Sequence, residues 1–326
     1  MVVFLAFVVA GLLSVIITPV FMAYFTRKKI GQTTREEGPK WHQVKTGTPT
    51  MGGTVFVLVS CLVFLIFALI LKLPLGKVLI ILLNFLLFAA IGFVDDFLSI
   101  FHHQNEGLKP KQKFLAQLAF SALIMLMIYF IKWTVYIPLL GWQIDHWLFL
   151  AIFIFIWITG FSNAVNLTDG LDGLATGLNI IAYTSYFYLA QKQSEPVIAL
   201  FCMIVVGSLL GFLFFNHKPA KIFMGDVGSL ALGAGLALIS VLLSNPWSLL
   251  IIGLVFVIET ASVILQVASF KLTGKRIFKM SPIHHHFEMS GWSEEKVVLV
   301  FWLTGLISSL IYFSIFSDIL VKRVIE

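Results

Sequence analysis

Carboxylates, with one amide among them, collect where long apolar stretches of this sequence begin or end. They are the pair Asp95-Asp96, the glycine-flanked series Asn166, Asp169 and Asp172, and the single Asp226. A carboxylate at the edge of hydrocarbon is costly and is usually functional. Two adjacent carboxylates also repel each other unless a cation or a proton lies between them. Because the chain has only two cysteines, this donor set favours a hard cation such as Mg²⁺.

The spacing of the glycine-flanked series predicts a shared face. Residues three apart lie on the same side of a helical turn, so Asn166, Asp169 and Asp172 would point in one direction. Plainer roles are also open. Asn166 and Asp169 could cap the helix predicted over 174–190, Asp226 could be an N-cap, and the pair of aspartates could reach toward the membrane surface.

Three further segments carry groups that bind anions. They are Lys45-Thr-Gly-Thr-Pro-Thr-Met-Gly-Gly53, the stretch from Asn216 to Asp226 with Lys218 and Lys221, and the run His284-His285-His286. Gly-rich turns let backbone N–H groups point at an anion, and Lys and His donate to phosphate oxygens. The first segment is equally typical of a turn before a helix. The histidines could hold zinc, but three neighbours rarely converge on one ion, so hydrogen bonds to phosphate or sugar fit better.

A metal site, a site for a polyphosphate and an apolar environment together point to one kind of reaction. Mg²⁺ in such sites is held by one or two carboxylates together with the phosphates of the substrate. Basic side chains and Mg²⁺ neutralise the charge that repels an incoming phosphate. The combination predicts phosphoryl transfer involving a lipid at a membrane surface.

The elements that must position these groups are membrane-spanning helices. Of the 326 residues, 59% are hydrophobic and only 12% are charged, whereas a typical soluble domain has about 25% charged residues. The apolar residues form runs of the length that crosses a bilayer, about 20 residues. There are ten, at 1–24, 53–72, 78–98, 114–131, 147–165, 174–190, 197–214, 227–243, 249–270 and 297–318, and the sixth is polar at both ends. The sequence therefore predicts an all-α, polytopic membrane protein with a single domain over 1–326.

Positive charges set the expected orientation. Sorted by the loops between these runs, sixteen of the 22 Lys and Arg residues fall on one side. Because such an excess marks the cytoplasmic side, we expect both termini outside. Twelve of the 16 acidic residues also fall on that side, although acidic residues do not follow the rule. Longer inner loops explain Glu294 and Glu295 but not the aspartates at the ends of the runs, which predict an active site on the cytoplasmic face.

The same segments carry a resemblance to a known family. The strings are Thr48-Pro-Thr-Met-Gly-Gly53, Asp95-Asp96, Asn166-Leu-Thr-Asp-Gly-Leu-Asp-Gly-Leu174, Phe223-Met-Gly-Asp226 and Pro282-Ile-His-His-His-Phe287. In order and spacing they resemble those of the bacterial phospho-N-acetylmuramoyl-pentapeptide transferases, a branch of the polyprenyl-phosphate N-acetylhexosamine 1-phosphate transferases. The likeness covers nearly the whole chain, and the first and last strings favour the muramoyl branch.

The resemblance implies roles for single residues. It implies that Asp226 is the Mg²⁺ ligand and that Asp95, Asp96 and His284 are further catalytic residues, with Asp95 deprotonating or orienting the lipid phosphate. It implies that Phe223 stacks on uracil. The residues implied for substrate binding are Lys45, Lys113, Asn166, Asp169, Asp172, Asn216, Phe223, Gln266, His285 and His286.

The resemblance also implies the reaction and its setting. UDP-N-acetylmuramoyl-pentapeptide and undecaprenyl phosphate would give lipid I and UMP, with Mg²⁺ as cofactor, in peptidoglycan synthesis and hence in cell-wall growth, cell shape and cell division. The protein would be a multi-pass protein of the bacterial plasma membrane, frequently a homodimer, with no nucleic-acid partner. Two rival functions are a UDP-N-acetylglucosamine 1-phosphate transferase of the same superfamily and an ion-coupled transporter. A transporter is disfavoured because the sequence shows no internal repeat and its acids gather at one face.

Overall fold

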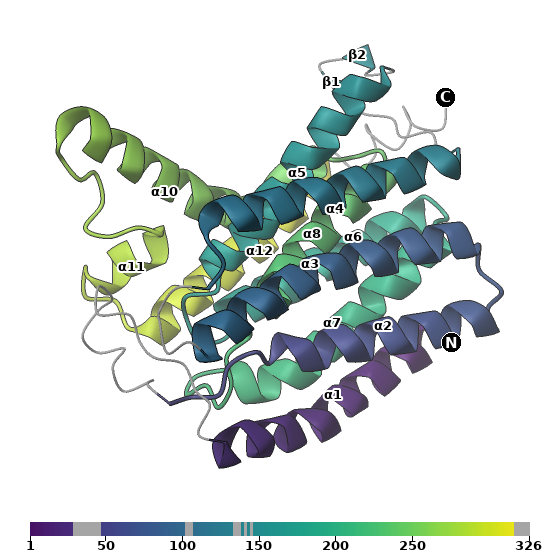
Figure 1. The fold of residues 1–326 in the computed structure, drawn as a ribbon, viewed down its shortest axis with the longest axis horizontal. Helices are drawn as coiled ribbons and strands as arrows, with labels where there is room; N and C mark the ends of the chain where they lie inside the picture. The colour runs from purple at the N-terminus through teal and green to yellow at the C-terminus, as the bar shows by residue number, and fades with distance from the viewer. Residues whose placement is uncertain (29–46, 102–106, 133–137, 140–141, 144–145, 316–326) are drawn as a thin grey trace.

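Helices make up almost all of the chain that is described, as the sequence predicts (Figure 1). The computed structural model describes residues 1–28, 47–101, 107–132, 138–139, 142–143 and 146–315. The helices are α1 (Val2–Arg27), α2 (Gly53–Ile70), α3 (Leu75–Phe101), α4 (Pro110–Phe130), α5 (Trp147–Thr168), α6 (Leu174–Lys192), α7 (Pro196–Asn216), α8 (Gly225–Leu242), α9 (Ser248–Ile252), α10 (Leu254–Thr273), α11 (Ile283–Glu288) and α12 (Glu294–Ile315). Two strands of two residues each, β1 (Pro138–Leu139) and β2 (Trp142–Gln143), pair antiparallel between α4 and α5.

A long helix stands in each of the ten predicted runs. Within the described ranges, nine helices are long and apolar enough to cross a membrane, and α6 is the exception. α6 has lower hydropathy because it carries Asn179 and several hydroxyl side chains, and it buries many of them inside the bundle. The ninth run is broken after Ile252, and α10 leaves the bundle at an angle (Figure 1). The protein is a multi-pass membrane protein.

α8 is the central helix of the bundle. Every residue from Val227 to Leu242 is buried, and α3 and α5 pack along α8. Backbones approach closely where side chains are smallest. A Cβ at Gly92 of α3 would collide with the backbone of Asp226, and one at Gly53 of α2 would collide with the backbone of Gly228. These contacts hold the first turn of α8 against the ends of its neighbours.

α1 and α7 pair through small residues. A Cβ at Gly207 would collide with the carbonyl oxygen of Phe7, and a Cβ at Gly211 would lie 2.5 Å from the carbonyl oxygen of Gly11. The four-residue spacing of Gly207 and Gly211 puts both glycines on one helix face, where they let α1 and α7 approach closely.

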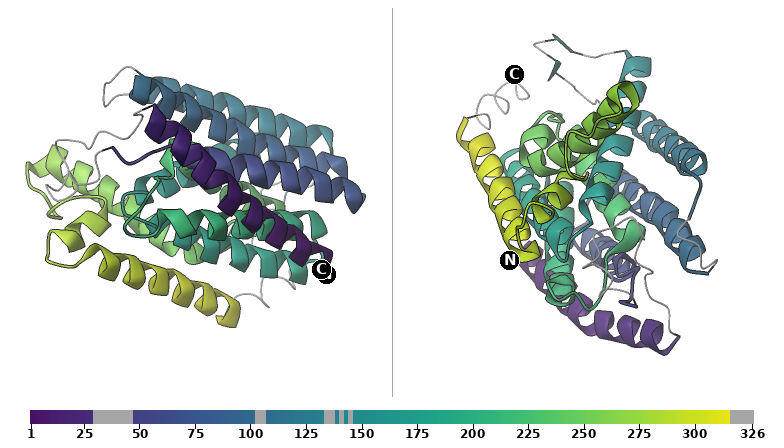
Figure 2. Two further views of the ribbon diagram at one scale, coloured as in Figure 1. Left: turned by 90° about the horizontal axis from the view of Figure 1, so that it is seen from below. Right: turned by 90° about the vertical axis from the view of Figure 1, so that its left-hand side faces the viewer.

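The outer surface of the bundle is apolar. Large apolar side chains such as Leu12, Leu126, Ile156 and Leu310 are exposed on α1, α4, α5 and α12. In water this surface would drive aggregation, whereas in a bilayer the acyl chains are the solvent for it. α12 lies at the edge of the bundle in both views of Figure 2, which explains why much of it faces outward.

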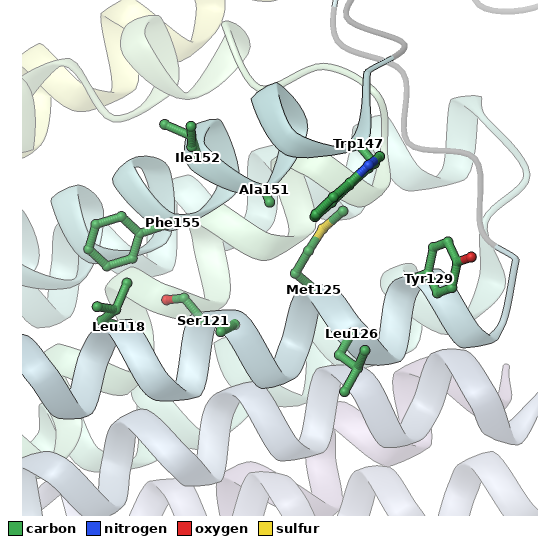
Figure 3. A pocket seen from close by; sticks show the side chains of 10 residues that line it. Leu118, Ser121, Met125, Leu126, Tyr129, Trp147, Ala151, Ile152 and Phe155 are labelled. Carbon is green, nitrogen blue, oxygen red and sulfur yellow. The ribbon is translucent and has the colours of Figure 1, made fainter.

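The helix ends that carry the polar motifs all lie at one end of the bundle. The chain reverses direction between successive spans, so the end of α3 and α5 adjoins the start of α4 and α8 (Figure 1). Further along α4 and α5, an apolar groove with a volume of about 550 Å³ opens between them, and Met125 points toward Trp147 across it (Figure 3). The groove is therefore separate from the polar end.

Candidate active site

Five polar side chains from four helices meet at the polar end of the bundle. We call Asp95, Asp96, Lys113, Asn166 and Asp226 the carboxylate cluster. Lys113 Nζ contacts Oδ2 of Asp226 and lies 3.5 Å from Oδ1 of Asp95. Asn166 donates to Oδ1 of Asp226 over 2.7 Å and to Ser229 Oγ over 2.9 Å. The prediction that these separated motifs lie together is confirmed.

Backbone geometry places the cluster. Gly225 adopts a φ of +74°, in the left-handed region that favours glycine, and starts α8 immediately before Asp226. A Cβ at Gly225 would lie 2.5 Å from Oδ2 of Asp96. That oxygen accepts a hydrogen bond from the N–H of Val227 over 3.2 Å, while Leu108 N–H donates to Oδ1 of Asp95 over 2.9 Å. α3 is thus tied to the first turn of α8 and to the segment before α4.

Lys113 balances the charge of the cluster. The side chains of this cluster are only partly exposed. The exposed fraction is 19% for Lys113, 17% for Asp95 and 23% for Asp226. Asp226 also lies in the first turn of α8, where the helix dipole favours a negative charge. It is therefore not an N-cap, because its carboxylate is bonded to Lys113 and Asn166 instead.

The donors of the cluster suit a hard divalent cation such as Mg²⁺. Asp95 and Asp96 lie near enough to Asp226 to interact with it electrostatically. The ammonium group of Lys113 already neutralises part of the negative charge of these carboxylates. In the described part of the chain, no group of three or more His, Cys, Asp or Glu side chains could hold a metal. A Mg²⁺ ion at Asp226 would accordingly need oxygens from a substrate as well.

A second set of polar residues fastens the loop between α7 and α8. We call Asp172, Thr176, Asn216, Lys218 and Glu294 the loop-anchoring network. Oδ2 of Asp172 accepts from the N–H of Ala220 over 2.9 Å, and the N–H of Asp172 donates to Glu294 Oε1 over 2.9 Å. Asn216 donates to the carbonyl of Ile222 over 2.9 Å and accepts from Thr176 over 2.6 Å.

Lys218 closes this network toward α12. Its Nζ lies 3.3 Å from Glu294 and 3.0 Å from Glu295. Partial burial disfavours the ammonium form, but the carboxylates of Glu295 and Glu294 outweigh that effect and raise the pKa of Lys218. Glu294, whose place on this side longer inner loops explain, is buried and bonded to the N–H of Asp172.

The backbone of the glycine-rich segment before α2 is hydrogen-bonded to the loop between α7 and α8. Phe223 N–H donates to Pro49 O over 2.8 Å, and the N–H groups of Gly52 and Gly53 donate to the carbonyls of Phe223 and Met224 over 2.9 Å and 2.8 Å. These two N–H groups are therefore not directed at an anion, contrary to one interpretation of the segment. Lys45 lies outside the described residues, and the proposed stacking of the half-buried Phe223 on uracil stays a prediction.

The prediction of one shared face for Asn166, Asp169 and Asp172 is wrong. α5 ends at Thr168, Asp169 is its C-cap residue, and the chain turns before α6 begins at Leu174. Asn166 consequently points to Asp226, whereas Asp172 points to Ala220. Neither aspartate nor Asn166 caps α6, whose N-cap is Gly173 without a side-chain hydrogen bond.

The three consecutive histidines have three different partners. Nδ1 of His284 lies 3.1 Å from Oε1 of Glu259, and Nδ1 of His285 lies 2.8 Å from Oε2 of Glu288. Nδ1 of His286 instead accepts from the N–H of Lys279 over 3.1 Å. The rings do not converge, so the alternative of a zinc site made by these histidines finds no support among the described residues.

Gln266 holds the chain that leads to the histidines. Its Oε1 accepts from the N–H groups of Ile277 and Phe278 over 2.9 Å and 3.0 Å, and its Nε2 donates to the carbonyl of Phe278 over 2.9 Å. These bonds satisfy both ends of a largely buried amide. Its predicted contact with the sugar stays a prediction.

Sequence reasoning missed Glu259. This side chain is 0% exposed in the middle of α10 and is the partner of His284. Its signal was present, because a single carboxylate within the ninth apolar run is as costly as the aspartates at the run ends. The sequence offered no way to pair it with a histidine 25 residues later.

Fold and site together define a class. The described residues form ten long helices with an apolar outer surface, and a lysine lies among carboxylates at one end of them. These are features of a polytopic membrane protein with a polar site at the membrane edge.

Comparison with known proteins narrows the class. The sequence model described as glycosyl transferase family 4 matches residues 78–244, which include the whole carboxylate cluster. A phospho-N-acetylmuramoyl-pentapeptide-transferase of Lactobacillus gasseri is 53% identical over 95% of this chain and 98% of its own length. Proteins of the same name are 54% identical in Levilactobacillus brevis, over 90% of this chain and 91% of the relative, and 50% identical in Listeria innocua, over 94% and 95%. The chain belongs to glycosyl transferase family 4 and to the phospho-N-acetylmuramoyl-pentapeptide-transferases.

Proposed function

We propose that this protein transfers phospho-N-acetylmuramoyl-pentapeptide from its UDP carrier to undecaprenyl phosphate, giving lipid I and UMP in peptidoglycan synthesis. The observation that carries this proposal is an identity of 53% over 95% of the chain to a relative named for this transfer. The carboxylate cluster supports it, because it combines a basic residue and three carboxylates at the membrane edge, where a lipid phosphate and a water-soluble nucleotide can both arrive.

The reaction makes one phosphorus–oxygen bond and breaks another. An oxygen of the lipid phosphate attacks the phosphorus that carries the sugar, and the bond from that phosphorus to the UMP oxygen breaks. The second pKa of a phosphate monoester is about 6, so the attacking group is mostly dianionic at neutral pH. The protein therefore has little deprotonation to perform. It must hold two anions in line and reduce their repulsion.

The carboxylate cluster is arranged for that task. Asp226 would hold Mg²⁺, and the ion would supply positive charge to stabilise the transferring phosphoryl group. Lys113, already between Asp95 and Asp226, is placed to contact the phosphates of both substrates. Asp95 orients the lipid phosphate, and Asp96, bonded to the backbone of α8, keeps α3 in register with Asp226. Asn166 fixes the rotamer of Asp226.

The remaining predicted contacts belong to the loop-anchoring network, α10 and α11. We assign the nucleotide and sugar to this side, because Asp172 and Asn216 bind the loop that leads into α8 and His284 of α11 lies against Gly170 of the turn that follows α5. The residues proposed there are Asp169, Asp172, Asn216, Phe223, Gln266, His284, His285 and His286, with Lys45 from the segment before α2.

The membrane setting is part of the proposal. Sixteen of 22 basic residues lie in loops on the side of the polar helix ends, which supports a cytoplasmic active site and outside termini. The apolar outer surface supports placement in a bilayer, which in a bacterium is the plasma membrane for this substrate pair. A homodimer is proposed on the family resemblance.

UMP release by purified protein tests the function. The assay contains undecaprenyl phosphate and Mg²⁺ in detergent and compares UDP-N-acetylmuramoyl-pentapeptide with UDP-N-acetylglucosamine. We expect release only with the muramoyl substrate, and loss of release with EDTA. Release only with the glucosamine substrate would assign the protein to the other branch. No release with either, together with substrate flux across vesicles, would favour a transporter.

The number of chemical steps has its own test. Enzyme quenched after mixing with substrate labelled at the transferred phosphorus carries label if a carboxylate, such as Asp95, forms an acyl phosphate. Enzyme without label in an active assay indicates direct attack by the lipid phosphate. Asp95→Asn serves as the control, because it replaces the carboxylate with an amide of the same size, which cannot form the acyl phosphate.

A further inference from the structure

Three basic residues at the end of α10 have no part in the chemistry described so far. Lys271 lies in the last turn of the helix, and Lys275 and Arg276 follow shortly after its end. We call these three residues the α10 basic tip. All three are exposed, and none of their side chains is paired with a carboxylate of the described residues. The dipole of α10 places only about half a negative charge at its end, so the tip carries a net positive charge.

Local structure keeps the α10 basic tip together. Gly274 adopts a φ of +69°, which ends α10 and reverses the chain. Ser269 Oγ donates to the carbonyl of Lys275 over 2.9 Å, and Oε1 of Gln266 accepts from the N–H of Ile277 over 2.9 Å. These bonds fold the chain back onto the last turns of α10, so that the three basic residues belong to one ordered turn.

Large apolar side chains are exposed at the same turn. Leu272 is 83% exposed and Ile277 is 55% exposed. Ile258 and Leu265 precede Leu272 at intervals of seven residues and are exposed as well, so apolar residues follow one side of α10 for about 21 Å up to its end. Because α10 projects from the bundle, this side meets the acyl chains of the bilayer, and the basic tip comes level with the lipid headgroups (Figure 1).

Membrane insertion by itself does not explain this arrangement. The rule that places basic residues on the cytoplasmic side counts charges in loops, and it requires no exposed leucine among them. Other basic residues that follow α10 have partners in the fold. Nζ of Lys279 donates to the carbonyl of Met289 over 3.0 Å, and Nζ of Lys296 lies 4.3 Å from the centre of the Trp292 ring. The α10 basic tip differs from them because its charges face outward beside apolar side chains.

We propose that the α10 basic tip binds the headgroup of an anionic phospholipid, with Leu272 and Ile277 among the acyl chains below it. Charge complementarity identifies the partner. The sequence has no Asp or Glu from residue 260 to residue 287, and Lys and Arg donate charge-assisted hydrogen bonds to phosphate oxygens. A zwitterionic phospholipid also has a phosphate, but its ammonium group cancels the charge. The surface lies outside the carboxylate cluster, so the proposal holds whether or not the protein releases UMP.

Quenching of a fluorophore at the tip measures which lipid gathers there. The full chain with Leu272→Cys takes an apolar bimane label at that position, because Cys61 and Cys202 are buried. Nanodiscs of phosphatidylcholine, with one protein copy each, contain the same small fraction of a quencher, either doxyl-phosphatidylglycerol or doxyl-phosphatidylcholine. We expect phosphatidylglycerol to be enriched about 10-fold or more at the label, since each basic residue near the surface strengthens the attraction about fivefold.

Two sets of substitutions at the tip separate charge from shape. Lys271→Gln, Lys275→Gln and Arg276→Gln together should make quenching by the two lipids equal. The exchange set Lys271→Arg, Lys275→Arg and Arg276→Lys keeps every charge and should keep the preference for phosphatidylglycerol. Because all three side chains are exposed, both sets should unfold in detergent near the midpoint of the parent protein. A preference that survives the glutamine set would overturn the proposal.

The opposite end of the bundle provides a matched control. Lys72, Lys132 and Lys192 are exposed at the ends of α2, α4 and α6 that lie away from the carboxylate cluster. Changing all three to Gln removes the same number of charges as the glutamine set at the tip. With the label still at position 272, this control should retain the preference for phosphatidylglycerol. Loss of the preference in the control would mean that overall charge, rather than the α10 basic tip, attracts the lipid.

The solution around the nanodiscs distinguishes a lipid from other occupants. Raising the salt from about 0.1 M to about 1 M shortens the screening length from about 10 Å to about 3 Å and should weaken the preference. Replacing chloride with inorganic phosphate at constant ionic strength should leave it unchanged, and its loss there would identify a site for free phosphate instead.

Two results in the labelled parent protein would overturn the proposal directly. Equal quenching by the two lipids would show that the tip has no preference for an anionic headgroup. A label that neither lipid quenches in nanodiscs with two copies, but that both quench equally in nanodiscs with one copy, would show that a second copy of the chain covers the tip.

Discussion

Asp226 and Asp172 lie at the same end of the bundle, yet their oxygens meet different kinds of partner. Both oxygens of Asp226 are bonded to side chains, those of Lys113 and Asn166. Asp172 instead accepts from the backbone N–H of Ala220, and its own N–H donates to Glu294. Asp226 is thus held by side chains that can turn toward a ligand, while Asp172 is held by the backbone of a loop.

The roles of these two aspartates follow from the groups that they contact. A carboxylate that faces other carboxylates across a lysine stores electrostatic repulsion, which a cation or a phosphate can relieve. Asp172, which accepts from the N–H of Ala220, instead fixes a loop. Both residues are aspartates from the polar motifs, and their partners distinguish their roles.

Replacement of Asp226 should give the largest effect. We expect Asp226→Asn to lower kcat for UMP release by about 10³-fold or more, because it removes the anionic ligand proposed for Mg²⁺ without changing side-chain size. The matched control is Asp172→Asn, whose amide oxygen can still accept from Ala220. Similar losses in the two variants would erase the contrast between the regions.

Replacement of Lys113 should follow in size. Lys113→Met is expected to lower kcat/KM by about 100-fold, since it removes the cation between Asp95 and Asp226. It should also make the unfolding midpoint in detergent more dependent on Mg²⁺, because the two carboxylates then lack compensation. Titrating Mg²⁺ in thermal unfolding of wild type and variant measures this, and identical titrations would contradict the role of Lys113.

Truncation of Asp172 should act on stability first. Asp172→Ala leaves the N–H of Ala220 without its acceptor and is expected to cost about 1–3 kcal/mol of unfolding free energy. KM for the nucleotide sugar should rise as the loop between α7 and α8 loosens, while kcat changes less. A variant with an unchanged unfolding midpoint and a lost kcat would place Asp172 in the carboxylate cluster instead.

We expect the smallest effect on activity and stability from a substitution at the end of the bundle opposite the carboxylate cluster. Lys77 donates to Glu195 over 2.8 Å at the start of α3 and α7, and both side chains are about a quarter exposed, at 24% and 25%. Lys77→Met should cost at most about 1 kcal/mol, as exposed ion pairs do. UMP release should be unchanged, and a marked loss of activity would mean that the polar end is not the only region coupled to catalysis.

Much of the fold could be predicted because membrane crossing imposes length and hydropathy on each helix. Each of the ten runs became a long helix, since a backbone in hydrocarbon must satisfy its own hydrogen bonds. The break after Ile252 was not predicted, because α9 and α10 are continuous in hydropathy. The lower hydropathy of α6 was visible as polar ends, but its burial within the bundle was not.

The candidate site was also only partly predictable from the sequence. The sequence placed Asp95, Asp96 and Asp226 together because each ends or begins a span at one side. It wrongly gave Asn166 and Asp172 one direction, since the end of α5 at Thr168 could not be read from spacing.

By itself, the sequence determined that this chain spans a membrane repeatedly and that its aspartate motifs, most of its lysines and its run of three histidines lie at one end of the spans. Hydropathy and chain reversal suffice for that, because both are properties of single segments. Only the tertiary structure decided that Lys113 lies between Asp95 and Asp226, that Asp172 binds a loop, and that Glu259 is the partner of His284. Those pairings depend on how helices rotate about their axes and how closely glycines let them approach, and no single segment contains that information.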